Sequence, residues 1–278
     1  MSDFPFPLPL SGRPVLGQST GRAIVMALLV LFLAACSHTA VRNPLAQWVH
    51  SENRDARRPQ LIVLHYTDQE SAEQSLKTLR TRNSKGRVSA HYLIGMDGRR
   101  YQLVADSERA WHAGAGRWGT IPEVNSASIG IEIDNNGHSP YPQVQIESLI
   151  VLLSDLTQRL GIPPSQVIGH SDLAPTRKID PGPLFPWKQL AEAGFGVWPD
   201  LGRASAPPAG FDPWLALQSL GYAVDDRPAV VRAFHHHFRG MEGTELDAED
   251  LRILYMLTLP PGEQAPQPAS QAHAEGDQ

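Results

Sequence analysis

Three short apolar stretches constrain the fold of this chain most strongly. They read QLIVLHY (60–66), SIGIEI (128–133) and VIGH (167–170), and each carries an ionisable residue at or near its end. Each is short and includes β-branched residues, which favours a buried strand over a helix. We therefore expect a central sheet with helices packed against it.

The segments between these strands supply the remaining elements of such a domain. Ser71 begins an amphipathic stretch with a capping-box pattern, and residues 142–160 have helical apolar spacing that ends at Gly161. Residues 88–93 and 99–104 are strand-like and flank an Asp-Gly turn, which predicts a hairpin. The pattern predicts an α/β (α+β) catalytic domain over residues 58–195, with a mixed central sheet flanked by helices.

The C-terminal third differs in composition. ASAPPAG (204–210) is typical of a linker, residues 211–259 predict three short helices in a small bundle, and residues 260–278 are of low complexity and expected to be disordered. The bundle contains three consecutive histidines, His235, His236 and His237. Consecutive helical residues point in different directions, so we expect these side chains on the helix surface and not around one ion.

The N-terminal segment has the layout of a secretory signal. Arg22 precedes an apolar run, and the sequence Leu-Ala-Ala before Cys36 resembles the bacterial lipobox. This predicts a signal peptide over residues 1–35, lipidation of Cys36 and a tether over residues 36–57. The alternative is a signal peptide cleaved elsewhere, with Cys36 incidental. Ser37 is compatible with sorting to the outer membrane.

Charge and cysteine content exclude several classes of protein. The formal net charge is -5, which gives no reason to expect a nucleic-acid partner. The chain has one cysteine, so an internal disulfide and a zinc cluster of several cysteines are both excluded.

Five residues at or after the predicted strands suggest a metal site. His65, His170 and Asp180 form a set of two histidines and one carboxylate, which suits zinc with an open position for water. Glu132 lies within an apolar strand, where a carboxylate is costly unless it is paired or functional, and it could act as a general base. Lys178 could place a cation beside a developing oxyanion. Each residue alone also fits a structural or solvent-exposed role, but the combination favours the metal site.

Five sequence segments resemble the successive motifs of zinc-dependent N-acetylmuramoyl-L-alanine amidases of the AmpD/AmiD type, which share a fold with peptidoglycan-recognition proteins. These segments are LIVLHYT, VSAHYLIGMDGRRYQLV, AWHAG, NSASIGIEI and VIGHSDLAPTRKIDPGPLFPW. The resemblance implies that zinc is bound by His65, His170 and Asp180, that Glu132 is the catalytic acid/base and that Lys178 stabilises the tetrahedral intermediate. It also implies substrate contacts for His112 and Asn125. His91 is expected to be structural.

The same resemblance implies hydrolysis of the amide between N-acetylmuramic acid and L-alanine in peptidoglycan and muropeptides. The lipobox then implies an outer-membrane lipoprotein facing the periplasm. LQSLGY and VVRAFHHHFRG in the C-terminal bundle resemble a three-helix peptidoglycan-binding domain, with an incomplete pattern. Two alternatives remain: a recognition protein that binds without cutting, and a zinc endopeptidase that cleaves another bond.

Overall fold

A computed structural model describes residues 42–56, 59–82 and 86–260 of the chain. The predicted signal peptide, the lipidation site Cys36, the start of the tether and the C-terminal tail from residue 261 lie outside the described residues. Within the described part of the chain, no helix is both long and apolar enough to cross a membrane.

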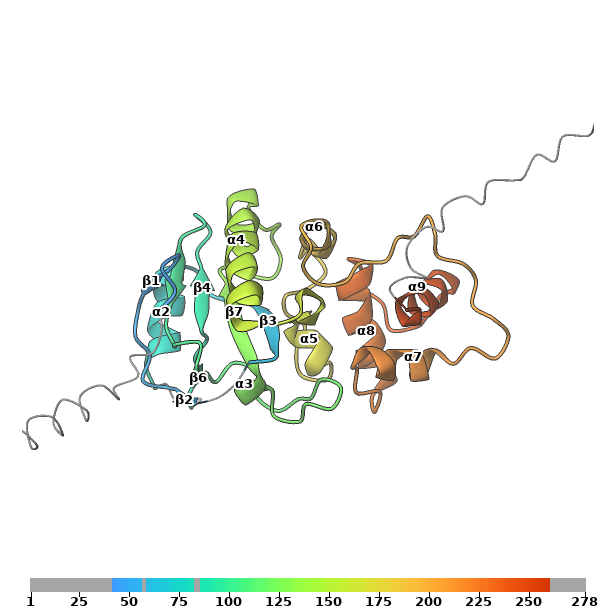
Figure 1. Cartoon of the computed structure of the whole chain (residues 1–278), viewed down its shortest axis with the longest axis horizontal. Helices are drawn as coiled ribbons and strands as arrows, with labels where there is room; N and C mark the ends of the chain where they lie inside the picture. Colours follow the sequence, from blue (N-terminus) through green and yellow to red (C-terminus); the bar gives the residue numbers. More distant parts are fainter. Residues whose placement is uncertain (1–41, 57–58, 83–85, 261–278) are drawn as a thin grey trace, which may run out of the picture. The chain divides into compact units, whose positions relative to one another are not determined.

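A six-stranded mixed sheet forms the centre of the fold (Figure 1). Its strands follow the order β1-β5-β4-β7-β3-β8, and β4, β7, β3 and β8 run parallel to one another while β5 is antiparallel to β4. The strands are β1 (Gln47–Trp48), β3 (Leu61–Tyr66), β4 (Tyr92–Ile94), β5 (Arg100–Gln102), β7 (Ser128–Ile133) and β8 (Val167–Gly169). A separate two-stranded ladder joins β2 (Asp55–Ala56) to β6 (Glu108–Arg109).

Eight α-helices and one 3-10 turn are assigned among the described residues. They are α2 (Ala72–Arg80), α3 (Val124–Ala127), α4 (Gln143–Leu160), η1 (Pro164–Gln166), α5 (His170–Leu173), α6 (Trp187–Glu192), α7 (Pro213–Leu220), α8 (Arg227–Phe238) and α9 (Ala248–Thr258). The predicted mixed α/β fold with a helical C-terminal region is confirmed.

The two faces of the sheet carry different kinds of side chain. One face packs beneath α4, where Leu149, Leu153 and Leu156 are fully buried against Leu64 and Ile131 of the sheet. Each such leucine contributes about 1.5–3 kcal/mol through burial. Because side chains alternate along a strand, the neighbouring residues His65 and Glu132 project from the opposite face. The apolar face anchors the sheet, and the other face carries the ionisable groups.

The ends of the predicted helices are held as the sequence indicates. The Ser71 hydroxyl accepts a hydrogen bond from the Gln74 amide and caps α2. Gly161 ends α4 with φ of 66°, a left-handed conformation that favours glycine. The predicted hairpin is present as the β4–β5 pair, with Gly98 at φ of 78° in its turn.

Part of the predicted tether belongs to the fold. Gln47 and Trp48 form β1, which pairs in parallel with β5 at the edge of the sheet. Asn43 is buried, and its side-chain amide donates to Asp155 of α4 at 2.7 Å. Two-residue strands leave too little periodicity in the sequence to be recognised.

The prediction that the three consecutive histidines lie on a helix surface is wrong. All three are buried, with exposed fractions of 2%, 2% and 5% for His235, His236 and His237. Each has its own carboxylate partner: Asp250 for His235, Glu242 for His236 and Asp172 for His237. They do point in different directions, as expected. However, α8 packs against α9 and also against α5 and α6.

Candidate metal centre

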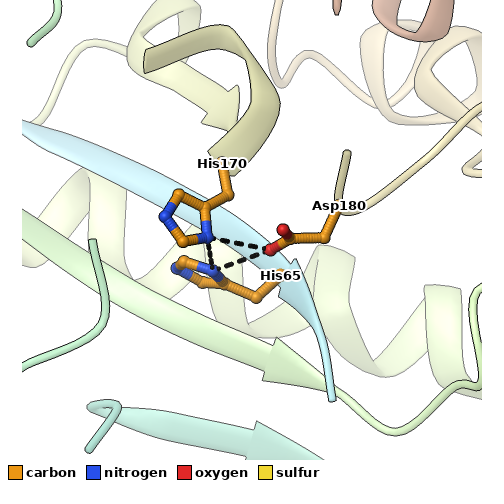
Figure 2. Close-up of side chains that lie close together, drawn as sticks. All are labelled: His65, His170 and Asp180. Carbon is orange, nitrogen blue, oxygen red and sulfur yellow. Dashed lines mark hydrogen bonds and ion pairs between the residues drawn. The ribbon is translucent and has the colours of Figure 1, made fainter. Parts of the chain in front are cut away.

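Three ligand-type atoms converge at the carboxyl ends of β3 and β8. His65 lies near the end of β3, His170 follows β8 as the first residue of α5, and Asp180 lies on the following loop. The two Nδ1 atoms are 2.9 Å apart, and each lies 3.0 Å from Asp180 Oδ2 (Figure 2). The structure thus brings together the three residues predicted as ligands. Among the described residues they form the one group of this kind.

The fold determines which nitrogen of His170 carries the proton. Its Nε2 lies 2.9 Å from the backbone carbonyl oxygen of Ala113. A carbonyl oxygen can only accept, so Nε2 must be the donor. In the neutral ring the lone pair is therefore on Nδ1, which faces the other two ligand atoms.

A longer chain of hydrogen bonds fixes His65 in the same way. The Ser128 hydroxyl donates its single proton to the carbonyl of Val124 at 2.6 Å. Ser128 Oγ must then accept from His112 Nε2 at 3.1 Å, which leaves His112 Nδ1 to accept from His65 Nε2 at 3.0 Å. His65 consequently also turns the lone pair of Nδ1 inward.

The centre therefore consists of three acceptors with no proton among them. Two imidazole lone pairs and a carboxylate oxygen about 3 Å apart repel one another unless a cation lies between them. Ligand atoms of a tetrahedral zinc site with bonds of about 2.0–2.1 Å are separated by about 3.3 Å, close to the spacing here. The donor set and its spacing fit a metal ion, and both imidazoles have the outer hydrogen bonds that metal-ligating histidines usually make.

The protonation states agree with this arrangement. Burial, with a contribution from His170, lowers the pKa of His65 to about 4, so its ring is neutral at pH 7. Burial alone would raise the pKa of Asp180, but its contacts with His170 and His65 lower it below its usual range. Metal ligands need these forms: neutral imidazole and ionised carboxylate.

Glu132 lies beside the centre on the next strand. It is the register partner of His65 in the parallel β3–β7 pair, and so projects from the same face of the sheet. Its side chain is buried and its Oε2 atom has no hydrogen-bond partner. Burial, aided by the charge of Asp180, raises the pKa of Glu132 to about 8, while Lys178 acts in the opposite direction. A cation bound by the triad would lower this pKa in the same sense as Lys178.

A cavity of about 490 Å³ opens over the centre. Glu132, Lys178 and the three ligand residues line it together with His112, Arg177 and residues 66–69. The Arg177 guanidinium donates to the carbonyls of Ala113 and Ala115, and so ties the loop before Lys178 to the loop that accepts from His170.

The geometry gives His112 and Asn125 a positioning role, while the substrate contacts expected of them stay predictions. Both ring nitrogens of His112 are engaged, by His65 and Ser128. Asn125 is buried and does not line the cavity; its Oδ1 accepts from the backbone amides of His112 and Ala113. Asn125 thereby fixes the two residues that accept from the ligand histidines.

His91 has the structural role expected from the sequence. It is fully buried, and its Nδ1 accepts from the Gly130 amide while its Nε2 donates to the Glu108 carbonyl. Its ring therefore holds β7 and β6 together and is not part of the ligand group.

Ser128 and Gly130 are functional positions that the sequence analysis missed. A Cβ on Gly130 would lie 2.3 Å from the His112 ring, so only glycine lets this ring approach β7 so closely. A glycine within a strand pattern often marks such a close approach, and this was the signal available in SIGIEI. Ser128 carried no comparable signal.

We expect His112→Ala to weaken metal binding about 10- to 100-fold, because His65 would lose the acceptor that fixes its tautomer. Titration of the ion-free protein against a chromophoric chelator measures this. His138→Ala makes the same change at an exposed histidine and serves as the control. Equal metal affinity in both variants would show that the hydrogen-bond chain does not support the ligand.

A second prediction concerns stability and pH in the chelator-treated protein. Folded Glu132 keeps its proton up to about pH 8, whereas the unfolded chain releases it near 4.5. The contribution of this carboxyl to the free energy of unfolding is therefore complete below about pH 4.5, and falls by up to about 1.4 kcal/mol per pH unit until pH 8. In Glu132→Gln this decline should be absent when urea unfolding is followed from pH 5 to 8. Parallel curves for the two proteins would mean that Glu132 is ionised throughout.

Comparisons with known proteins agree with this site. A family model described as N-acetylmuramoyl-L-alanine amidase matches residues 55–183. The amidase AmiD of Escherichia coli (strain K12) is 38% identical in an alignment 232 positions long, which covers 72% of this chain and 82% of AmiD. The 1,6-anhydro-N-acetylmuramyl-L-alanine amidase AmpD of Enterobacter cloacae is 40% identical over 103 residues, 37% of this chain and 55% of AmpD.

Solved structures give the same result. Escherichia coli AmiD in complex with anhydro-N-acetylmuramic acid-L-Ala-D-γ-Glu-L-Lys superimposes with a TM-score of 0.63 at 37% identity, covering 72% of this chain and 89% of that one. AmpDh3 from Pseudomonas aeruginosa gives a TM-score of 0.64 at 35% identity and covers 79% and 95%. The sheet carries a metal-binding group at its carboxyl ends, and AmiD matches this chain with the identity and coverage given above. The chain therefore belongs to the N-acetylmuramoyl-L-alanine amidase family.

Proposed function

We propose that this amidase is zinc-dependent and cleaves the amide between the lactyl group of N-acetylmuramic acid and L-alanine in muropeptides and peptidoglycan. The observation that carries the proposal is the convergence of His65 Nδ1, His170 Nδ1 and Asp180 Oδ2 without a proton among them, beside the unpartnered Oε2 of Glu132. Two imidazoles and one carboxylate are a common ligand set of catalytic zinc. AmiD and AmpDh3 have been solved with anhydromuramyl peptides, which supports this class of substrate.

Zinc held by these three residues would polarise the scissile carbonyl and acidify a water molecule. Glu132 then acts as the base: its Oε2 accepts the proton of the attacking water and passes it to the leaving nitrogen of L-alanine. Lys178 lowers the pKa of Glu132 that burial raises, and a cation held by the triad would lower it further and favour the ionised form at neutral pH.

Lys178 stabilises the oxyanion in the proposed reaction. It lines the cavity with Glu132 and lies close enough to lower the pKa of both Glu132 and His65. An ammonium group there stabilises the negative charge that develops on the carbonyl oxygen as water adds. The loop that carries Lys178 also carries Asp180, so the cation and the ligand keep a fixed spacing.

Digestion of purified muropeptides tests the bond that is cleaved. Mass spectrometry should show free peptides and peptide-free muramic acid. Shortened peptides still attached to muramic acid would indicate an endopeptidase. Intact muropeptide recovered with the protein would indicate a recognition module that binds without cutting.

Two substitutions test the assigned roles. Glu132→Gln should lower kcat about 10²- to 10⁴-fold and Lys178→Ala about 10²- to 10³-fold, with zinc still bound in both. Lys188→Ala removes an exposed lysine of α6 and should leave kcat unchanged. If Lys178→Ala empties the metal site, the role assigned to Lys178 is wrong.

We further propose that the protein is an outer-membrane lipoprotein facing the periplasm, acylated at Cys36. The support is the apolar run after Arg22 that ends in Leu-Ala-Ala-Cys. An acyl anchor would hold the catalytic domain near the cell wall and raise its effective concentration there.

Cys36→Ser should prevent acylation and leave the uncleaved precursor in the inner-membrane fraction, while catalysis by the detergent-solubilised enzyme is unchanged. Metabolic labelling with palmitate and membrane fractionation measure this. Labelling of the variant equal to wild type would place the modification elsewhere.

A further inference from the structure

The C-terminal helix α8 lies beside α5 and α6 and contacts the segment that carries two of the three metal ligands (Figure 1). At the centre of this contact is Asp172, which is fully buried. Its Oδ1 accepts from the Tyr222 hydroxyl at 2.7 Å, and its Oδ2 accepts from His237 Nδ1 at 2.7 Å. Tyr222 follows α7 and His237 belongs to α8, so both side-chain donors to this buried carboxyl come from the C-terminal region.

Asp172 connects these donors to the metal ligand His170. Its Oδ2 also accepts from the backbone amide of Gly169 at 2.7 Å, and so holds the first turn of α5, where His170 is the first residue. The amide of Ser171 in turn donates to the carbonyl of Asp180 at 2.8 Å. The backbone next to both ligands therefore depends on where the Asp172 carboxylate is held.

Other residues of α8 contact the rest of the segment that carries the ligands, from Pro175 to Trp187. Arg232 donates to the carbonyl of Pro175 at 3.1 Å, and His236 Nδ1 lies 3.4 Å from the carbonyl oxygen of Ile179. The His237 ring stacks on Trp187, with ring centroids 3.8 Å apart and planes inclined by 13°. The loop with Lys178 and Asp180 is thus held by α8 at its beginning, at its middle and beyond its end.

We propose that the C-terminal helices are part of the scaffold of the active site, in which Tyr222 and His237 are positioning residues that hold His170 through Asp172. This inference rests on the metal site proposed above. A module that only binds the cell wall would affect the hydrolysis of polymeric peptidoglycan. A scaffold must also affect metal affinity and the hydrolysis of small soluble muropeptides.

The full-length double variant Tyr222→Phe/His237→Phe tests the proposal. It removes both side-chain donors to Asp172 but keeps a ring over Trp187. It costs no other hydrogen bond of the His237 side chain, because Nε2 has no partner. We expect zinc to bind about 10- to 100-fold more weakly in competition with a chelator. We also expect kcat on a soluble anhydromuramyl tripeptide to fall at least about tenfold under limiting zinc, with KM unchanged.

Leu254→Ala is the matched control. It opens a cavity in the core of the bundle and should lower Tm. Leu254 packs in the same apolar cluster as Tyr222 but makes no hydrogen bond to Asp172, so this variant changes the packing and keeps both side-chain donors. Zinc affinity and kcat at 20 °C should equal those of wild type. Tyr222→Phe alone removes one oxygen atom and should weaken zinc binding several-fold; it provides the measurement if the double variant does not fold.

The outcomes separate this inference from the proposed function. If the donor variants lose Tm as Leu254→Ala does but keep the zinc affinity and kcat of wild type, Asp172 only joins two packed parts and the inference is wrong. It is equally wrong if only the digestion of insoluble peptidoglycan declines. If wild-type protein binds no zinc and releases no peptide, the proposed function itself fails, and the inference fails with it.

Discussion

The repulsion among three inward-facing lone pairs is the interaction on which the rest of this structure depends. His65 Nδ1, His170 Nδ1 and Asp180 Oδ2 lie within 3.0 Å of one another, and hydrogen bonds elsewhere take the protons that could have separated them. Such a group is unfavourable in the folded chain unless a cation is bound. The hydrophobic face beneath α4, with its fully buried leucines, supplies stability on the other side of the same sheet. The fold thus holds a locally unfavourable arrangement ready for an ion.

The proton positions follow from backbone carbonyls at the ends of each hydrogen-bond chain. Ala113 accepts directly from His170, and Val124 accepts from Ser128 at the end of the chain that begins at His65. A carbonyl cannot donate. The donors and acceptors in either series of hydrogen bonds therefore cannot be exchanged without losing a buried hydrogen bond, at a cost of about 1–3 kcal/mol. The backbone therefore determines which nitrogen each imidazole offers. Asn125 reinforces both chains by fixing the amides of residues 112 and 113.

Local pattern in the sequence was enough to predict the strands that carry the site. His65, Glu132 and His170 lie in or directly after apolar stretches, and parallel strands bring their carboxyl ends to one edge of a sheet. The roles of His112 and of the His235–His237 run could not be predicted this way. A histidine in a motif gives its position along the chain but not which residue takes its proton. The burial of α8 depends on contacts with residues 172–187, which are distant in sequence. The edge strand β1 could not be predicted from the sequence, because two residues are too few to show a periodicity.

In the proposed mechanism, the metal centre and the general base Glu132 also depend on each other through charge. In the ion-free protein, burial and the negative charge of Asp180 hold the pKa of Glu132 near 8, so at neutral pH its carboxyl is largely protonated and cannot accept a proton from water. A divalent cation beside Asp180 reverses the sign of the nearest charge and favours the ionised form. On the proposed mechanism, ion binding would thus fill the ligand set and convert Glu132 into a base in a single step. Burial of the carboxyl is what couples these two events, because an exposed glutamate would be ionised with or without the ion.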